Sequence, residues 1–169
     1  MSTTTYVDTS VYTVTYVTEK LLLSIKEIIR ESGLSPAKMA GQWDSLERGI
    51  STWIRSKHLK QVYLEIFDPV KKKLVCRWDL DIVYGYGGDG EFWVDTDAIK
   101  CHIAKAGAIA STCEYRICVD HSSQAPSVQG WTRCTLYSTN GLSRFSVGTT
   151  LGGSDIGASL SYWGKECLR

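Results

Sequence analysis

The sequence has almost no net charge and no long hydrophobic run. Nineteen basic and eighteen acidic side chains leave a formal net charge of +1 over 169 residues. Such a chain gains little from a phosphate backbone at physiological salt, so nucleic acid is not expected as a direct partner. Apolar stretches such as Leu21–Leu23 are far too short to cross a bilayer, and residues 1–6 lack the pattern of a signal peptide. We therefore expect a cytoplasmic protein without membrane contact.

The chain also has few residues arranged for metal or redox chemistry. Its six cysteines show no C-x-x-C spacing, and Cys113 and Cys118 fall on opposite faces of one expected strand. We therefore expect no metal site and no cofactor. A cytosolic domain of this size does not need a disulfide framework, so most cysteines are interpreted as reduced core residues. Cys101 and His102 are neighbours, but consecutive side chains on a helix point about 100° apart.

Three local patterns come close to catalytic motifs and fall short of them. Residues 85–90 satisfy G-x-G-x-x-G, yet four residues separate them from the next expected helix, and no βαβ repeat surrounds them. Residues 152–156 lack the last glycine of a nucleophile elbow. Asp79 and Asp81 share one face of a strand, and the alternation assigns that face to solvent. None of these three patterns supports a catalytic assignment.

Apolar spacing predicts three helices. The first ends at Gly33 and has an apolar stripe formed by Val14, Val17, Leu21, Ile25, Ile28 and Ile29. A second amphipathic helix starts at Asp44, whose spacing to Glu47 is that of a capping box. A third begins near Asp95 and runs to Ala110. Each helix has one apolar side to pack against a sheet.

Alternating residues predict the strands. Residues 61–84 form a hairpin, Cys113 to Asp120 a further strand of the same sheet, and Trp131 to Tyr137 another strand. Residues 138–163 contain short β pieces interrupted by glycine, so their register is weakly specified and they look able to rearrange. Residues 3–13, rich in threonine, fit either a short strand or a loose arm.

This order of elements resembles the HORMA domain over nearly the whole chain. The resemblance implies a single α+β domain, with three helices packed on a mainly antiparallel sheet and a β-rich, mobile C-terminal segment called the safety belt. Residues 1–12 correspond to an N-terminal arm, residues 13–121 to the core and residues 131–169 to the belt. The size and compact ending look most like the bacterial HORMA proteins of antiphage defence systems (CBASS).

The resemblance implies a regulatory binding protein and not an enzyme. In such a protein the belt closes around a closure-motif peptide of another protein, and the closed form binds and activates a cGAS-like nucleotidyltransferase. An AAA+ ATPase reopens it by pulling on the arm, here Thr3, Thr4, Thr5 and Tyr6. The peptide-binding residues implied by position are Cys113, Tyr115, Ile117 and Val119 in the strand, and Phe145, Val147, Leu151, Ile156, Leu160, Tyr162 and Trp163 in the belt.

Two alternatives stay open at the level of sequence. One is a small α+β enzyme with a Cys/His site, in which Cys113 or His102 is the reactive group. The other is a companion HORMA subunit that does not close and instead offers its own tail to a second HORMA protein. The first alternative requires one indispensable side chain, whereas peptide binding does not.

Overall fold

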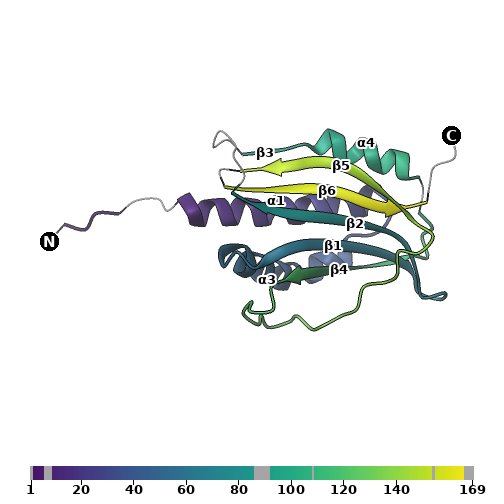
Figure 1. Cartoon of the computed structure of the whole chain (residues 1–169), viewed down its shortest axis with the longest axis horizontal. Helices are drawn as coiled ribbons and strands as arrows, with labels where there is room; N and C mark the ends of the chain where they lie inside the picture. The colour runs from purple at the N-terminus through teal and green to yellow at the C-terminus, as the bar shows by residue number, and fades with distance from the viewer. Residues whose placement is uncertain (1, 6–8, 86–91, 108, 154, 166–169) are drawn as a thin grey trace.

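The computed structural model describes residues 2–5, 9–85, 92–107, 109–153 and 155–165. Within them the chain forms four helices and six strands (Figure 1). The helices are α1 (Thr9–Glu31), α2 (Ala37–Gly41), α3 (Trp43–Arg55) and α4 (Thr96–Ala106). The strands are β1 (Leu59–Asp68), β2 (Lys73–Tyr84), β3 (Trp93–Val94), β4 (Glu114–His121), β5 (Ser143–Gly152) and β6 (Ile156–Gly164). The predicted α+β class is confirmed.

All strands belong to one antiparallel sheet with the order β3-β5-β6-β2-β1-β4. The predicted hairpin is β1 and β2, with Gln61 opposite Asp81 and Asp68 opposite Lys73. The strand predicted from residue 113 is β4, which pairs with the outer side of β1. The β5–β6 hairpin joins the other side of the sheet through β2, with Arg77 opposite Trp163. Strand β4 is therefore one edge of the sheet, and β3 is the other.

The helices cover one face of this sheet, and the core lies between the two layers (Figure 1). The stripe predicted for α1 is buried throughout, since none of its six residues is more than 6% exposed. It packs with the inward residues of the central strands, which include Val62, Leu64, Trp78 and Leu80. Gly33 ends this region at a φ of +87°, a left-handed conformation that glycine adopts without strain.

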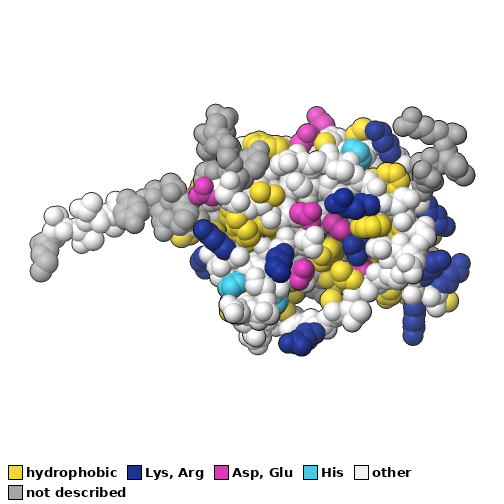
Figure 2. Space-filling view, in the orientation of Figure 1, with side chains coloured by type: hydrophobic (Ala, Val, Ile, Leu, Met, Phe, Trp, Pro, Cys, Tyr) yellow, Lys and Arg dark blue, Asp and Glu magenta, His cyan; other side chains and the backbone are white. Residues whose placement is uncertain are grey.

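The opposite face is polar, and parts of it are nevertheless buried. Figure 2 shows basic and acidic side chains next to one another over the strands. Asp79 was expected on the solvent side, yet it is only 6% exposed. Its carboxylate accepts hydrogen bonds from Arg77 at 2.7 Å and from the Trp163 indole at 3.3 Å. This correction follows from the length of neighbouring side chains, which cover a short aspartate on a flat sheet.

Several predicted boundaries were wrong. Helix α1 begins at Thr9, inside the predicted arm, whereas Thr3, Thr4 and Thr5 are exposed without regular structure and Tyr6 lies outside the described residues. Helix α3 begins at Trp43, one residue before the predicted cap Asp44, and has no side-chain cap. Glu47 accepts a hydrogen bond from the Trp43 indole at 3.1 Å. Helix α4 stops at Ala106, since Gly107 has a φ of +86°.

The C-terminal third also differs from its prediction. Residues 131–137 form no strand, because the backbone groups of Thr135 and Tyr137 bond to side chains of the sheet. In contrast, β5 and β6 form a continuous hairpin from Ser143 opposite Gly164 to Gly152 opposite Gly157, with two irregular points in its register. The region has a more definite register than its glycine content indicated.

Candidate functional site

The free edge of β4 is the feature of the sheet best suited to binding. Among the described residues, β4 has a partner strand only on its β1 side. The Tyr115 carbonyl accepts a hydrogen bond from Lys38 Nζ at 2.9 Å, so it points away from β1. Hydrogen-bonding direction alternates along an antiparallel strand, so the backbone groups of Ile117 and Val119 point to the same outer side. They are available to another strand.

A long segment without regular structure passes around this edge. We call residues 122–142, which join β4 to β5, the crossing segment. Since β4 is at one edge of the sheet and β5 lies beyond β6 and β2, these residues must cross several strands. Figure 1 shows the crossing segment leaving β4, running beside it at a distance, and passing over the strand ends to β5. It therefore lies where a belt around β4 would lie.

A cavity of about 400 Å³ lies between β4 and the crossing segment. We call it the β4 groove. Its wall contains Trp53 from α3, four residues of β4 (Ile117, Cys118, Val119 and His121), and nine residues of the crossing segment: Ser123, Ala125, Pro126, Ser127, Val128, Trp131, Thr132, Arg133 and Cys134. None of these lining residues is acidic. The outward backbone of Ile117 and Val119 therefore faces a partly open groove with a mixed polar and apolar lining.

The first part of the crossing segment is anchored to α3 by two tryptophans. Trp131 donates its indole N–H to the Ser45 carbonyl at 2.9 Å, and Trp53 donates to the Pro126 carbonyl at 2.8 Å. The two indoles meet edge to face, with ring centroids 5.0 Å apart. Trp131 comes so close to Gly49 that a Cβ there would lie 2.2 Å from its ring nitrogen. This anchor fixes the far wall of the β4 groove.

The second part of the crossing segment is anchored on the polar face of the sheet by a buried carboxylate. Glu65 has no exposed side-chain surface, and it accepts hydrogen bonds from Arg116 at 2.7 Å and from the Tyr137 backbone N–H at 2.8 Å. Arg116 also donates to the Thr135 carbonyl at 2.6 Å. The Tyr137 ring stacks on Phe67, with centroids 5.0 Å apart. A charge that is both paired and hydrogen-bonded can be held in such a site.

The strand residues predicted to bind peptide divide between two places. Ile117 and Val119 line the β4 groove. Cys113 and Tyr115 line a separate hollow of about 540 Å³ near the end of α1. The Tyr115 hydroxyl there donates to the Ser35 carbonyl at 2.8 Å and accepts from the Met39 N–H at 3.1 Å, so it supports the loop before α2.

The belt residues predicted beside β4 lie elsewhere. β6 pairs with β2, so the hairpin is separated from β4 by both central strands. Leu151, Ile156, Leu160 and Tyr162 are buried in the core, and Phe145 and Val147 are partly buried against it. Trp163 lies on the polar face beside Asp79. The structure therefore does not bring these seven residues to the β4 groove, because β1 and β2 lie between the β5–β6 hairpin and β4.

Of the residues that enclose β4, the sequence predicts only loop for residues 123–128, and a strand of the belt for residues 131–134. Residues 122–130 carry no periodic pattern, and their partners on α3 are distant in the chain. Trp131, Pro126 and Trp53 were the available signals, since a tryptophan in a polar loop usually has a buried partner. The identity of that partner could not be obtained from spacing.

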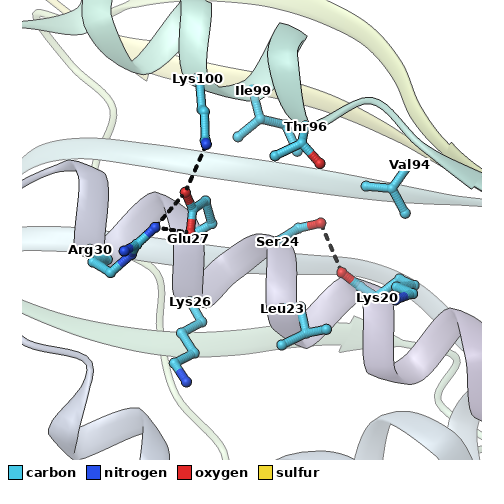
Figure 3. A pocket seen from close by; sticks show the side chains of 10 residues that line it. All are labelled: Lys20, Leu23, Ser24, Lys26, Glu27, Arg30, Val94, Thr96, Ile99 and Lys100. Carbon is cyan, nitrogen blue, oxygen red and sulfur yellow. Dashed lines mark hydrogen bonds and ion pairs between the residues drawn. The ribbon is translucent and has the colours of Figure 1, made fainter.

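A second groove lies between α1 and α4, with a volume of about 560 Å³ (Figure 3). Glu27 lies near its centre and pairs with Arg30 at 2.8 Å and with Lys100 at 3.7 Å. These hydrogen bonds and charges lower the pKa of Glu27. Lys20 and Lys26 add to the basic lining. The ion pairs are solvent-exposed and contribute little, so we regard this groove as secondary to the β4 groove, which lies along a free strand edge.

Cys113 does not resemble an activated nucleophile. Burial raises the pKa of Cys113, which disfavours the thiolate that a cysteine enzyme needs. His102 is on α4 and its ring lies 6.4 Å from that of Tyr162. Within the described residues no three His, Cys, Asp or Glu side chains gather as metal ligands. None of the described helices is long and apolar enough to cross a membrane.

Comparison with known proteins gives the family. No curated protein sequence matches the chain. A chain of the mitotic checkpoint complex superposes with a TM-score of 0.75 at 9% identity, over 90% of this chain and 98% of that chain. C. elegans HTP-2 bound to a HIM-3 closure motif gives 0.61 at 11% identity over 92% of each chain.

A bacterial structure is also similar. The E. coli MS115-1 HORMA:CdnC:Trip13 complex contains a chain with a TM-score of 0.55 at 12% identity, over 95% of each chain. At these identities the structural matches show the fold alone. The sequence itself matches the family described as bacterial HORMA domain 2 over residues 1–166. The chain therefore belongs to the bacterial HORMA domain 2 family.

Proposed function

We propose that this protein is an adaptor that binds a closure-motif peptide of another protein as an extra strand on β4. The observation that carries the proposal is the outer backbone of Ile117 and Val119, which faces the β4 groove. An extended peptide there gains main-chain hydrogen bonds from β4 and specificity from pockets for alternate side chains. The HTP-2 structures, which contain closure motifs, support the assignment by fold.

The lining of the β4 groove indicates the chemistry of the peptide. Trp53 lies 5.0 Å from Trp131 and 4.7 Å from His121, measured between ring centroids, so one end of the groove is aromatic. Arg133 is the one lining residue with a permanent charge. The peptide therefore carries an apolar side chain against Trp53 and is neutral or acidic near Arg133.

The crossing segment supplies the closing part of the mechanism. It is already anchored at Trp131 and at Tyr137, which is the arrangement expected of a closed belt. Opening must break both anchors or detach β6 from β2, and the second route exposes Leu160 and Tyr162 from the core. Such a change is slow without work from outside, which fits a remodelling ATPase acting on Thr3, Thr4, Thr5 and Tyr6.

In the proposed pathway, the peptide-bound form binds and activates a cGAS-like nucleotidyltransferase of a CBASS antiphage system, and an AAA+ ATPase reverses the activation. The relative found in a complex with CdnC and Trip13 supports these partners. The protein has a regulatory role in this scheme and performs no chemistry of its own.

A matched pair of substitutions tests the proposed site. Ala125 lines the β4 groove, whereas its neighbour Gln124 is exposed and does not. Peptides that bind the native chain are first selected from a random display library, and their affinities for Ala125→Trp and Gln124→Trp are then measured by fluorescence polarisation. Filling the groove with an indole should weaken binding at least about tenfold in Ala125→Trp, while Gln124→Trp binds normally.

The same two variants also test the proposed activation of the nucleotidyltransferase. Peptide-loaded native chain and Gln124→Trp should stimulate product formation by the cognate nucleotidyltransferase, and Ala125→Trp should not. A library that yields no binding peptide, or equal affinities of the two tryptophan variants, would contradict the proposed site.

A further inference from the structure

Two thiols lie close together in the lining of the β4 groove. Cys118 lies on β4 and Cys134 lies in the crossing segment, and both line the cavity. The two side chains are close enough to form a hydrogen bond. Arg116 and Glu65 hold this region together, since Arg116 donates to the carbonyl of Thr135, the residue next to Cys134. The Cys118 thiol is also 3.8 Å from Glu65 Oε1.

The two cysteines also lie at the two ends of the stretch of chain that forms most of the groove wall. Of the residues that line the β4 groove, only Trp53 and Ile117 lie outside the stretch from Cys118 to Cys134. A bond between the two sulfur atoms would therefore close nearly the whole wall of the groove into one covalent ring. No other pair of described cysteines joins β4 to the crossing segment.

The two thiols differ in solvent exposure, so an oxidant would react with one of them before the other. Cys134 is exposed, so a small oxidant can reach it, whereas Cys118 is buried. Residues around Cys134 have no regular structure, so its side chain can move from hydrogen-bond to bonding distance without breaking a strand ladder. Both are free thiols in the structure.

We propose that Cys118 and Cys134 form a reversible disulfide that fixes the crossing segment against β4. The oxidant is a low-molecular-weight disulfide such as oxidised glutathione. The Cys134 thiolate attacks one of its sulfur atoms and releases one glutathione thiolate. Cys118 then loses its proton, attacks the Cys134 sulfur and displaces the second glutathione. Two protein thiols are oxidised, one glutathione disulfide is reduced to two thiols, and the atoms and electrons balance.

The second step sets the rate. Burial and the contact with Cys134 raise the pKa of Cys118 to about 12, so little of its thiolate exists at neutral pH. Conversion of the Cys134 thiol to a mixed disulfide removes one proton-bearing neighbour, while Arg116 beside it favours the Cys118 thiolate. The bond therefore forms slowly and is reversed by a reductant, as expected of a device that responds to sustained oxidation.

The consequence for function rests on the proposed peptide binding. A peptide held on β4 would leave more slowly when the segment that covers it cannot swing away. Closing a loop of about fifteen residues disfavours its opening by roughly a hundredfold. The disulfide itself needs no peptide, so its formation can be tested in the free chain.

The test uses the full chain with oxidised glutathione as the probe. Free thiols are blocked with N-ethylmaleimide after oxidation, and peptides are identified by mass spectrometry without reduction. Cys134→Ser removes the exposed partner, and Cys101→Ser, an exposed cysteine on α4, is the matched control. Hydrogen exchange of residues 126–134 is then compared before and after oxidation.

The expected result is a Cys118–Cys134 crosslink in the native chain and in Cys101→Ser, and none in Cys134→Ser. Exchange in residues 126–134 should slow at least about tenfold in the crosslinked forms. Glutathione adducts on Cys134 without a crosslink, or a dominant crosslink to another cysteine, would overturn the inference. Because no peptide is present, this result is independent of whether the β4 groove binds one.

Discussion

Gly49 determines how closely Trp131 of the crossing segment can approach α3. A Cβ at this position would lie 2.2 Å from the Trp131 ring nitrogen, and Trp131 is itself fixed by its hydrogen bond to Ser45. We predict that Gly49→Ala displaces Trp131, lowers the free energy of unfolding by about 1–3 kcal/mol and speeds hydrogen exchange in residues 127–134.

The control for this change is Gly41→Ala. Gly41 is at the end of α2, has no atom within 4 Å of its Cβ direction and is not held at a positive φ. The substitution there should be neutral or stabilise by up to about 1 kcal/mol. Chemical denaturation of both variants would decide, and equal stability with unchanged exchange would show that Trp131 is not an anchor.

At the residue scale, the sequence identified the β4 residues of the candidate groove. It did not identify the contacts that hold the crossing segment against the sheet. Alternation placed Ile117 and Val119 on β4, where they line the groove. It could not show that Glu65 accepts a hydrogen bond from Tyr137, because a carboxylate on an alternating strand looks the same whether solvent or another segment covers it.

At the scale of elements, the central β1–β2 hairpin contains three side chains that lose their protons at alkaline pH. Burial raises the pKa of Tyr63 in β1, and of Cys76 and Tyr84 in β2, to about 12. The unfolded chain loses these protons near its ordinary values of 10.0 and 9.0. The stability that they contribute is therefore complete below about pH 9 and is lost as the pH rises toward 12.

We predict that the urea midpoint is steady near neutral pH and falls by about pH 10.5, where the unfolded chain binds fewer protons than the folded one. Tyr84→Phe removes one of these groups together with its hydrogen bond to the Leu59 carbonyl, and should make the fall shallower. Tyr12→Phe, at an exposed position on α1, is the control. A midpoint that does not change with pH would contradict the role assigned to burial.

Elements with strong periodicity were predictable, and the crossing segment was not. The stripe of α1 and the alternation of β1, β2 and β4 identified a large part of the core because each pattern reports one buried face. Trp131 to Tyr137 alternates as well, but its backbone bonds to Glu65 and Arg116 instead of a strand. Local pattern cannot distinguish these outcomes, since the deciding partners come from elsewhere in the chain.

At the scale of the whole molecule, the sheet has two edges with different roles. The β5–β6 hairpin completes the side next to β2 and buries its apolar residues under the helices. The β4 edge stays open to a strand and is enclosed by residues anchored on α3 and on the polar face. The division keeps the core apart from the segment that covers the proposed peptide edge.

The most direct test of this account is residue-level hydrogen exchange of β4 by NMR, with and without a peptide selected for binding. We predict that the amides of Ile117 and Val119 exchange quickly in the free chain and slow at least about tenfold with peptide, because each then donates to the added strand. Amides of Arg116 and Cys118, which face β1, should change little. Protection confined to β3 or to the groove between α1 and α4, with Ile117 and Val119 unchanged, would contradict binding at β4.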